Sequence, residues 1–140
     1  MVHLYPVLSV SPAKEDHATL RQLLDGTPWQ IRESYSLRSA ILLLEKHRVP
    51  LLICERELHP GSWEELLGQL AGFPSPPFVI VVSRQADEDL WVKALGAGAY
   101  DVLAKPFSPS ELRRTLSGAS QLWHDTFATE GAPRIIAAGA

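Results

Sequence analysis

Short runs of apolar residues recur along the chain and alternate with segments whose apolar residues return every three or four positions. The runs predict β-strands, and the three-to-four spacing predicts the buried stripe of a helix. Strands are predicted over residues 7–10, 51–54, 78–82 and 102–104, with a weaker one at 29–31. Helical stripes are predicted at Ala13, His17, Leu20 and Leu24, at Leu37, Ala40, Ile41 and Leu44, at Trp63, Leu66, Leu67 and Leu70, and at Leu112, Leu116, Ala119 and Trp123.

Strand and helix alternate about five times, and the connections between them are short. This order predicts an α/β fold in which helices cover both faces of a parallel sheet. The central runs are apolar at every position, as expected for strands buried on both faces. We expect one domain over residues 1–123, followed by a tail or linker stub over residues 124–140, where the periodicity is lost.

The predicted helices also carry sequence signals at their starts. Ser11-Pro12 is expected to open the first helix, because Ser can accept backbone N–H bonds and Pro tolerates the first helical position. Ser62 and Ser108 each precede a Glu by three residues, which is the pattern of a capping box.

Composition and charge exclude several classes of function. The 140 residues include 13 Lys and Arg against 16 Asp and Glu, a formal net charge of -3. No cationic excess is available for nucleic acid or an anionic membrane, so neither is an expected direct partner. Cys54 is the only cysteine, which excludes an internal disulfide and favours a reducing, cytoplasmic setting. The five histidines show no H-x-x-x-H pairing, so no metal is expected.

Ligands of a doubly wound sheet bind beyond the carboxyl ends of its strands, so the residues that follow each apolar run are the candidates. No phosphate-binding glycine loop and no hydrolase nucleophile motif is present, and we expect neither an enzyme nor a bound cofactor. The residues after the first, third, fourth and fifth strands are Ser11 and Pro12, Glu55, Arg56 and Glu57, Ser83, and Lys105.

The sequence GAYDVLAKPF at residues 98–107 resembles the end of a bacterial response-regulator receiver domain. Residues 79–83 are similar to the receiver's fourth strand with its switch hydroxyl, and residues 51–61 to its third strand and the Pro-Gly turn. The resemblance covers residues 3 to about 123. It implies a flavodoxin-like fold with the strand order 2-1-3-4-5.

The same resemblance indicates an atypical receiver. Receivers bind Mg²⁺ through an acidic pair after the first strand, and here those positions hold Ser11 and Pro12. They accept phosphate on an Asp four residues before the turn proline, and counting back from Pro60 places Arg56 there. Val102 replaces the aromatic residue that commonly rotates with the switch hydroxyl. Metal ligands and nucleophile are therefore expected to be missing.

Ser83 and Lys105 keep the receiver's hydroxyl and lysine. For both, a structural reading, in which Ser83 caps a turn and Lys105 is solvated, stands beside a functional one. In the functional reading Lys105 pairs with Glu55 or Glu57 across the strand ends, because a partly buried ammonium without a counter-charge is costly. Residues 55–57 could equally form a solvated loop entrance or a glutamate-based metal or phosphate site. Asp16 and Glu15 could supply a carboxylate to this site, but their place in the opening turns of the first helix favours the ordinary role of complementing its dipole.

Trp91 stands in the otherwise acidic helix predicted at residues 87–95. It is expected either to complete the core or to be partly exposed and mark a contact surface. In receivers the fourth helix, fifth strand and last helix form the usual partner and dimer surface. This resemblance assigns Trp91, Tyr100 and Val102 to an expected interaction surface for a protein partner or a second copy.

These observations lead to three functional hypotheses. The first is a receiver that works without phosphorylation as a protein-interaction module in signal transduction or transcriptional control. The second is a response regulator that accepts a phosphoryl group on Glu55 or Glu57. The third is a flavodoxin-like binder of a small molecule in the vacated pocket.

Overall fold

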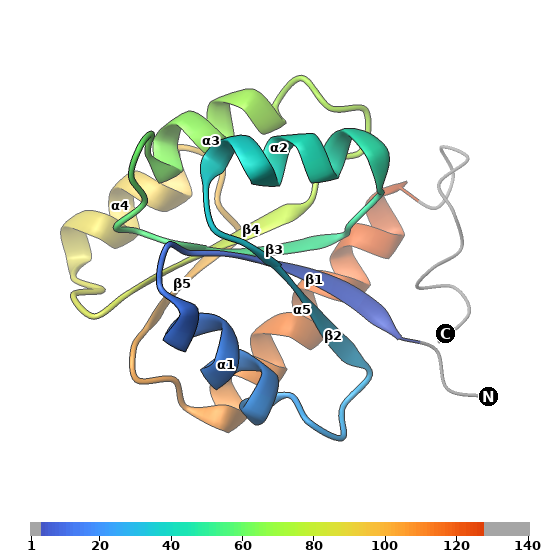
Figure 1. The fold of residues 1–140 in the computed structure, drawn as a ribbon, viewed down its shortest axis with the longest axis vertical. Coiled ribbons are helices and arrows are strands. Elements are labelled where there is room, and N and C mark those ends of the chain that lie inside the picture. Colours follow the sequence, from blue (N-terminus) through green and yellow to red (C-terminus); the bar gives the residue numbers. More distant parts are fainter. Residues whose placement is uncertain (1–3, 128–140) are drawn as a thin grey trace.

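The computed structural model describes residues 4–127, which form a five-stranded parallel sheet with helices on both faces (Figure 1). The order of the strands is β2-β1-β3-β4-β5, which confirms the expected flavodoxin-like arrangement. The elements follow one another as β1 (Tyr5–Val10), α1 (Lys14–Leu23), β2 (Trp29–Ser34), α2 (Leu37–Lys46), β3 (Leu51–Glu55), α3 (Trp63–Leu70), β4 (Phe78–Ser83), α4 (Glu88–Gly96), β5 (Asp101–Ala104) and α5 (Pro109–Phe127).

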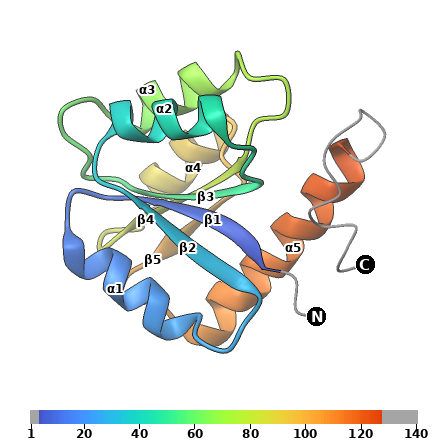
Figure 2. The same cartoon turned by 45° about the vertical axis from the view of Figure 1, so that its right-hand side comes forward.

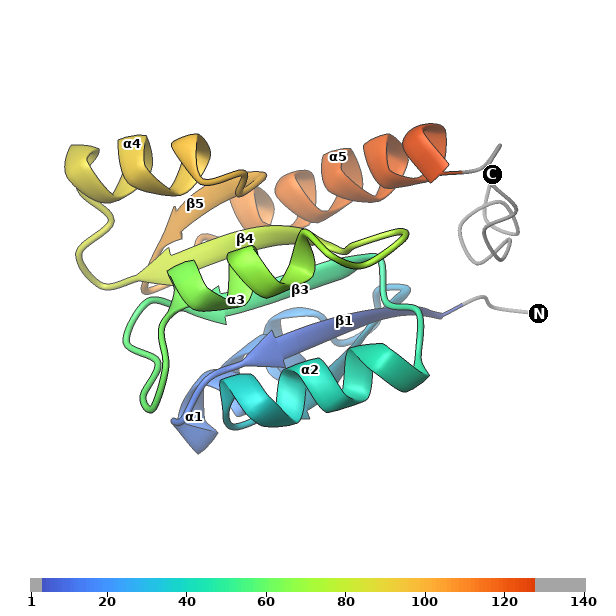
Figure 3. The ribbon, with the colours of Figure 1, turned by 90° about the horizontal axis from the view of Figure 1, so that it is seen from above.

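The sheet separates two apolar cores. Helices α2, α3 and α4 follow one another across one face, and α1 and α5 cover the other (Figures 2 and 3). Alternate residues of each central strand enter opposite cores, as the twofold period of a strand requires. In β3, Leu52 and Cys54 pack under α2–α4, whereas Leu51 and Ile53 pack against α1 and α5. This alternation also decides which polar side chains meet at the end of each strand.

The starts of the helices follow local chemistry at α3 but not at α1. Ser62 caps α3 by accepting a hydrogen bond from the backbone N–H of Glu65 at 3.1 Å. The start expected at Ser11-Pro12 is wrong by two residues, because α1 has Ala13 as its N-cap and begins at Lys14. Ser11 Oγ instead accepts a hydrogen bond from the backbone N–H of Ala13, at 3.1 Å, in the turn before the helix. Ser11 is thereby held at the strand end.

The last helix passes the boundary expected at residue 123. Helix α5 continues to Phe127, whose buried ring packs against Trp123 at 5.1 Å between ring centroids. The indole Nε1 of Trp123 donates to the carbonyl of Pro76 at 3.0 Å, which ties the helix end to the loop before β4. The rest of the expected tail, residues 128–140, lies outside the described residues. Among residues 4–127, no helix has both the length and the apolar character needed to cross a membrane.

Candidate functional site

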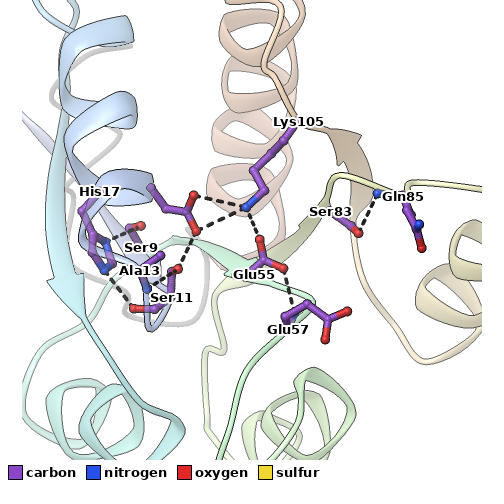
Figure 4. A network of polar contacts seen from close by, with 10 residues as sticks. Ser9, Ser11, Ala13, His17, Glu55, Glu57, Ser83, Gln85 and Lys105 are labelled. Carbon is purple, nitrogen blue, oxygen red and sulfur yellow. Dashed lines mark hydrogen bonds and ion pairs between the residues drawn. The ribbon is translucent and has the colours of Figure 1, made fainter.

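Polar side chains converge beyond the carboxyl ends of β1, β3, β4 and β5, where the loop into α1 closes one side (Figure 4). They border an open hollow of about 570 Å³. Its lining includes the expected residues Ser11, Pro12, Glu55, Glu57, Ser83 and Lys105, together with Ala13, Glu15, Asp16, Arg84 and Gln85. The topology therefore brings together residues that are up to 94 positions apart along the chain.

Lys105 lies at the centre of this group. Its Nζ donates to Glu55 Oε1 and to both carboxylate oxygens of Asp16, at 3.1 and 3.3 Å (Figure 4). The side chain of Lys105 is 12% exposed, that of Glu55 7% and that of Asp16 19%. The backbone N–H of Lys105 donates to the carbonyl of Ser83 at 2.9 Å, which fixes the lysine beside β4. One ammonium group therefore bridges two largely buried carboxylates.

Glu55 is the last residue of β3 and uses both of its carboxylate oxygens. While Oε1 accepts from Lys105, Oε2 accepts from the backbone N–H of Glu57 at 2.7 Å. Of the two partners expected for Lys105, the structure thus pairs the lysine with Glu55. Glu57 has an exposed side chain, with its Oε2 3.9 Å from the imidazole of His59.

The structure corrects the position expected for Arg56. Glu55 shares the side of β3 on which Leu51 and Ile53 pack, and α1 and α5 cover that side. Arg56 follows Glu55 and so has the opposite parity, and it does not line the hollow. Its backbone N–H still donates to the carbonyl of Val82, at 2.9 Å. Counting back from Pro60 is therefore wrong by one residue, because the turn holds one residue more than the pattern assumes.

Asp16 reaches the site from the first turn of α1, whereas the sequence interpretation favoured a role in complementing the helix dipole. Besides Lys105, it is bonded by Ser11, whose Oγ donates to Asp16 Oδ2 at 2.6 Å. An acidic residue in the first turn of a helix usually complements the helix dipole, and that general preference concealed this contact. The available signal was position: the first turn of a helix that directly follows a parallel strand stands over the same edge of the sheet.

His17 lies behind Asp16 and is fully buried. Because a carbonyl only accepts, Nε2 donates to the carbonyl of Ser11 at 3.0 Å, and Nδ1 accepts from Ser9 Oγ at 2.8 Å. The ring also packs against Tyr35, with 4.6 Å between centroids. Burial lowers the pKa of His17 from its ordinary value of 6.5, against the opposing effects of Ser11 and Asp16. The neutral imidazole is therefore part of the support of the site.

Ser83 is buried at the end of β4, and its Oγ accepts a hydrogen bond from the backbone N–H of Gln85 at 3.0 Å (Figure 4). Ser83 therefore caps the turn after β4, which is the structural role that the sequence offered for it. Pro12 is exposed and supplies no ligand. Among residues 4–127, no group of three or more His, Cys, Asp or Glu side chains could hold a metal ion.

The expected interaction surface is only partly a surface. Trp91 is 46% exposed, and with Val92 and Leu95 it forms an exposed apolar stripe on α4. Val102 does not belong to it, because it is 5% exposed and lies in the core beneath α4. Tyr100 lies on the other side of the sheet, where its ring stacks on Phe78 with 5.8 Å between centroids. Neither residue belongs to the stripe, because Val102 of β5 is covered by α4 and Tyr100, which precedes β5, packs against the opposite face of the sheet.

Comparison with known proteins places this geometry in a family. The model of the response regulator receiver domain matches residues 7–117. This chain belongs to the response regulator receiver domain family. It is 32% identical over 110 residues to the KDP operon transcriptional regulatory protein KdpE of Escherichia coli (strain K12), a match that covers 79% of this chain and 48% of KdpE.

Two further relatives extend this comparison. The alginate biosynthesis transcriptional regulatory protein AlgB of Pseudomonas aeruginosa is 30% identical over 104 residues, which are 74% of this chain and 23% of AlgB. A signal receiver domain from Vibrio parahaemolyticus superposes with a TM-score of 0.84 at 24% identity, covering 92% of this chain and 99% of that one. The receiver chain thus spans about half, or less, of the length of the curated relatives that it matches.

Proposed function

We propose that this receiver domain works without aspartyl phosphorylation, as a protein-interaction module in signal transduction or transcriptional control. The observation that carries the proposal is the bridge from Lys105 to Glu55 and Asp16. In receivers, as the resemblance implies, this lysine pairs with the acceptor and the phosphate. Here it has two carboxylate partners supplied by the chain itself.

The chemistry of phosphoryl transfer lacks two of its components at this site. A divalent cation needs several anionic oxygens, and the positions of the receiver's acidic pair carry Ser11 and Pro12. A carboxylate nucleophile attacks through an accessible oxygen, and the side chain of Glu55 is only 7% exposed while Lys105 and the backbone N–H of Glu57 hold its two oxygens in place. Asp16, the other carboxylate close to Lys105, is bonded to the lysine and to Ser11.

A permanent ion pair also changes what the domain can signal. A ligand shifts a conformational equilibrium only by its difference in affinity for the two states. With Lys105 already held between Glu55 and Asp16, the arrival of phosphate no longer supplies a new partner for the lysine. We therefore propose that the strand ends stay in one arrangement and present one constant surface.

We expect no phosphorylation when the protein is incubated with acetyl phosphate and Mg²⁺. Intact-mass measurement is expected to show the unmodified mass, and beryllium fluoride with Mg²⁺ is expected to leave the amide NMR spectrum unchanged. A gain of one phosphoryl group that Glu55→Gln abolishes, with Glu57→Gln as the matched control, would contradict the proposal. That result would instead identify Glu55 as the acceptor.

We further propose that the exposed stripe of α4, formed by Trp91, Val92 and Leu95, binds a second copy of this chain. The helix carries Glu88 and Asp89 in its first turn and Lys93 in its last turn. Two such helices packed antiparallel about a twofold axis place the acidic end of one beside the lysine of the other. The apolar stripe would then be buried between them. The alternative occupant of the same stripe is another protein.

Trp91→Ala is expected to weaken self-association by about tenfold or more, because an aromatic residue at the centre of an interface often contributes most of the affinity. Sedimentation velocity over a concentration series measures this effect. Leu42→Ala is the matched control, since Leu42 is 49% exposed on α2 and lies away from the stripe. A monomeric wild type at all concentrations would reject the second copy, and equal association of both variants would reject the stripe.

A further inference from the structure

The amino ends of the strands carry a second cluster of charge, opposite to the Lys105 site. There the end of α2 and the loop from α3 to β4 lie at the same end of the sheet (Figure 3). They border a hollow of about 480 Å³, and an adjoining hollow of about 290 Å³ lies toward β2. Lys46, His47 and Arg48 line both hollows. Two cavities therefore share one short basic segment.

The cations of this cluster outnumber its anions. Arg32 joins Lys46 and Arg48 along the smaller hollow, and Glu45 is the single acidic residue in either lining. None of the ion pairs within residues 4–127 involves Arg32, Lys46 or Arg48. This is unusual in a chain whose formal net charge is -3. Three cations that form no ion pair within the described residues and outnumber the acidic residues around them favour the binding of an anion.

Arg48 supplies the observation that points to a ligand. Its Nη1 is buried, and no residue of the described part of the chain accepts a hydrogen bond from it. A buried guanidinium donor without an acceptor is costly, so natural sites normally supply an oxygen for it. Because Nη1 itself is covered, the guanidinium has to turn toward one of the two hollows that Arg48 lines before an oxygen from outside the described chain can accept from it.

We infer that this cluster is a binding site for a small phosphate ester of nucleotide size. Arginine matches phosphate by donating parallel N–H bonds, and lysine adds a mobile point charge. Several positive charges suit a phosphate dianion better than a single carboxylate. Phe73 and Pro74 add apolar wall to the larger hollow, which falls within the usual size of small-molecule sites. This inference is independent of the proposed function, because it uses no residue of the Lys105 site.

The test is binding of AMP to the full chain, measured by isothermal titration calorimetry and thermal unfolding at constant ionic strength. AMP is expected to raise the melting temperature in a saturable way, because a ligand that binds only the folded state stabilises it by mass action. Inorganic phosphate is expected to bind more weakly, and adenosine not at all. Binding of citrate as tight as that of AMP would overturn the phosphate class, and the absence of binding by AMP and phosphate would overturn the site.

The variant Arg48→Met tests the site more directly than the choice of ligand does. Loss of the charged hydrogen bonds is expected to weaken AMP binding by about tenfold or more. The same change removes the buried unpartnered donor, so the unliganded variant is expected to melt at a temperature no lower than the wild type. Lys46→Met is expected to weaken AMP binding severalfold. Because Lys46 is exposed, this loss reports the missing charge and not a change in packing of the kind that a substitution at Arg48 could cause.

Two controls locate the binding. Arg38→Met changes an exposed arginine at the other end of α2, which lines neither hollow, and should leave AMP binding unchanged. Arg84→Met changes an arginine that lines the hollow beside Lys105. If AMP binding is lost with Arg84→Met and kept with Arg48→Met, the phosphate binds at the carboxyl end of the sheet, and the inference is wrong.

Discussion

Replacing Lys105 with methionine is expected to lower the free energy of unfolding by about 3–5 kcal/mol, the usual effect of removing one partner from a buried ion pair. The change leaves the carboxylates of Glu55 and Asp16 without the ammonium that both contact, and both are largely buried. Chemical denaturation with urea, monitored by tryptophan fluorescence, measures the difference. Methionine retains most of the length of lysine, so the effect reports the charge more than the packing.

Two further variants show whether the effect belongs to the pair. Adding Glu55→Gln to Lys105→Met is expected to recover part of the lost stability, because only the carboxylate of Asp16 is then left without the ammonium, in place of two carboxylates. Lys93→Met, at an exposed lysine of α4, should change stability by less than about 0.5 kcal/mol. A loss below about 1 kcal/mol for Lys105→Met would mean that the pair behaves as a surface salt bridge, and the fixed state proposed for the strand ends would lose its support.

The stability of the protein is expected to fall as the pH decreases below 6.5, because of His17. Burial lowers the pKa of His17 in the folded state below 6.5, so between the two pKa values the unfolded chain binds a proton that the folded protein does not. The free energy of unfolding therefore increases with pH in this window, and the full contribution is present above 6.5. Because a single group is involved, the slope of this dependence is at most about 1.4 kcal/mol per pH unit.

Urea denaturation between pH 7.5 and 5.5 measures this dependence, and His17→Gln should flatten it. Glutamine is chosen because its amide can still donate to the carbonyl of Ser11, as Nε2 of His17 does at 3.0 Å. His59→Gln is the matched control, since His59 has an 80% exposed side chain. An equal pH dependence in wild type and His17→Gln would show that other groups cause it.

Much of the fold could be predicted from the pattern of the sequence. The apolar runs and the three-to-four spacing predicted five strands and their intervening helices in the right order. A strand buried on both faces is apolar at every position, whereas a helix buried on one face is apolar at every third or fourth position. The cap at Ser62 was also predictable, since a hydroxyl three residues before a free N–H needs no distant partner. Local signals worked where the interaction itself was local.

The chemistry of the candidate site was only partly predictable. The sequence indicated that Lys105 would find a carboxylate near the end of β3, and Glu55 is that partner. It placed Arg56 rather than Glu55 at the acceptor position, because the length of a turn can change by one residue, whereas the parity of a strand in a packed sheet cannot. For Asp16 the sequence favoured the local role at the helix start, because its contact with Lys105 joins residues 89 positions apart.

Only the tertiary structure decided which side chains are buried and which line a hollow. Val102 was expected on the interaction surface from the family resemblance, yet the packing of α4 buries it. In the sequence Arg48 is one more charged residue after α2. In the folded chain it lines a hollow together with the loop before β4, and its Nη1 is buried. Residue type and spacing determine the local elements, but burial and the meeting of charges depend on which surfaces the folded chain brings into contact, and those contacts are long-range.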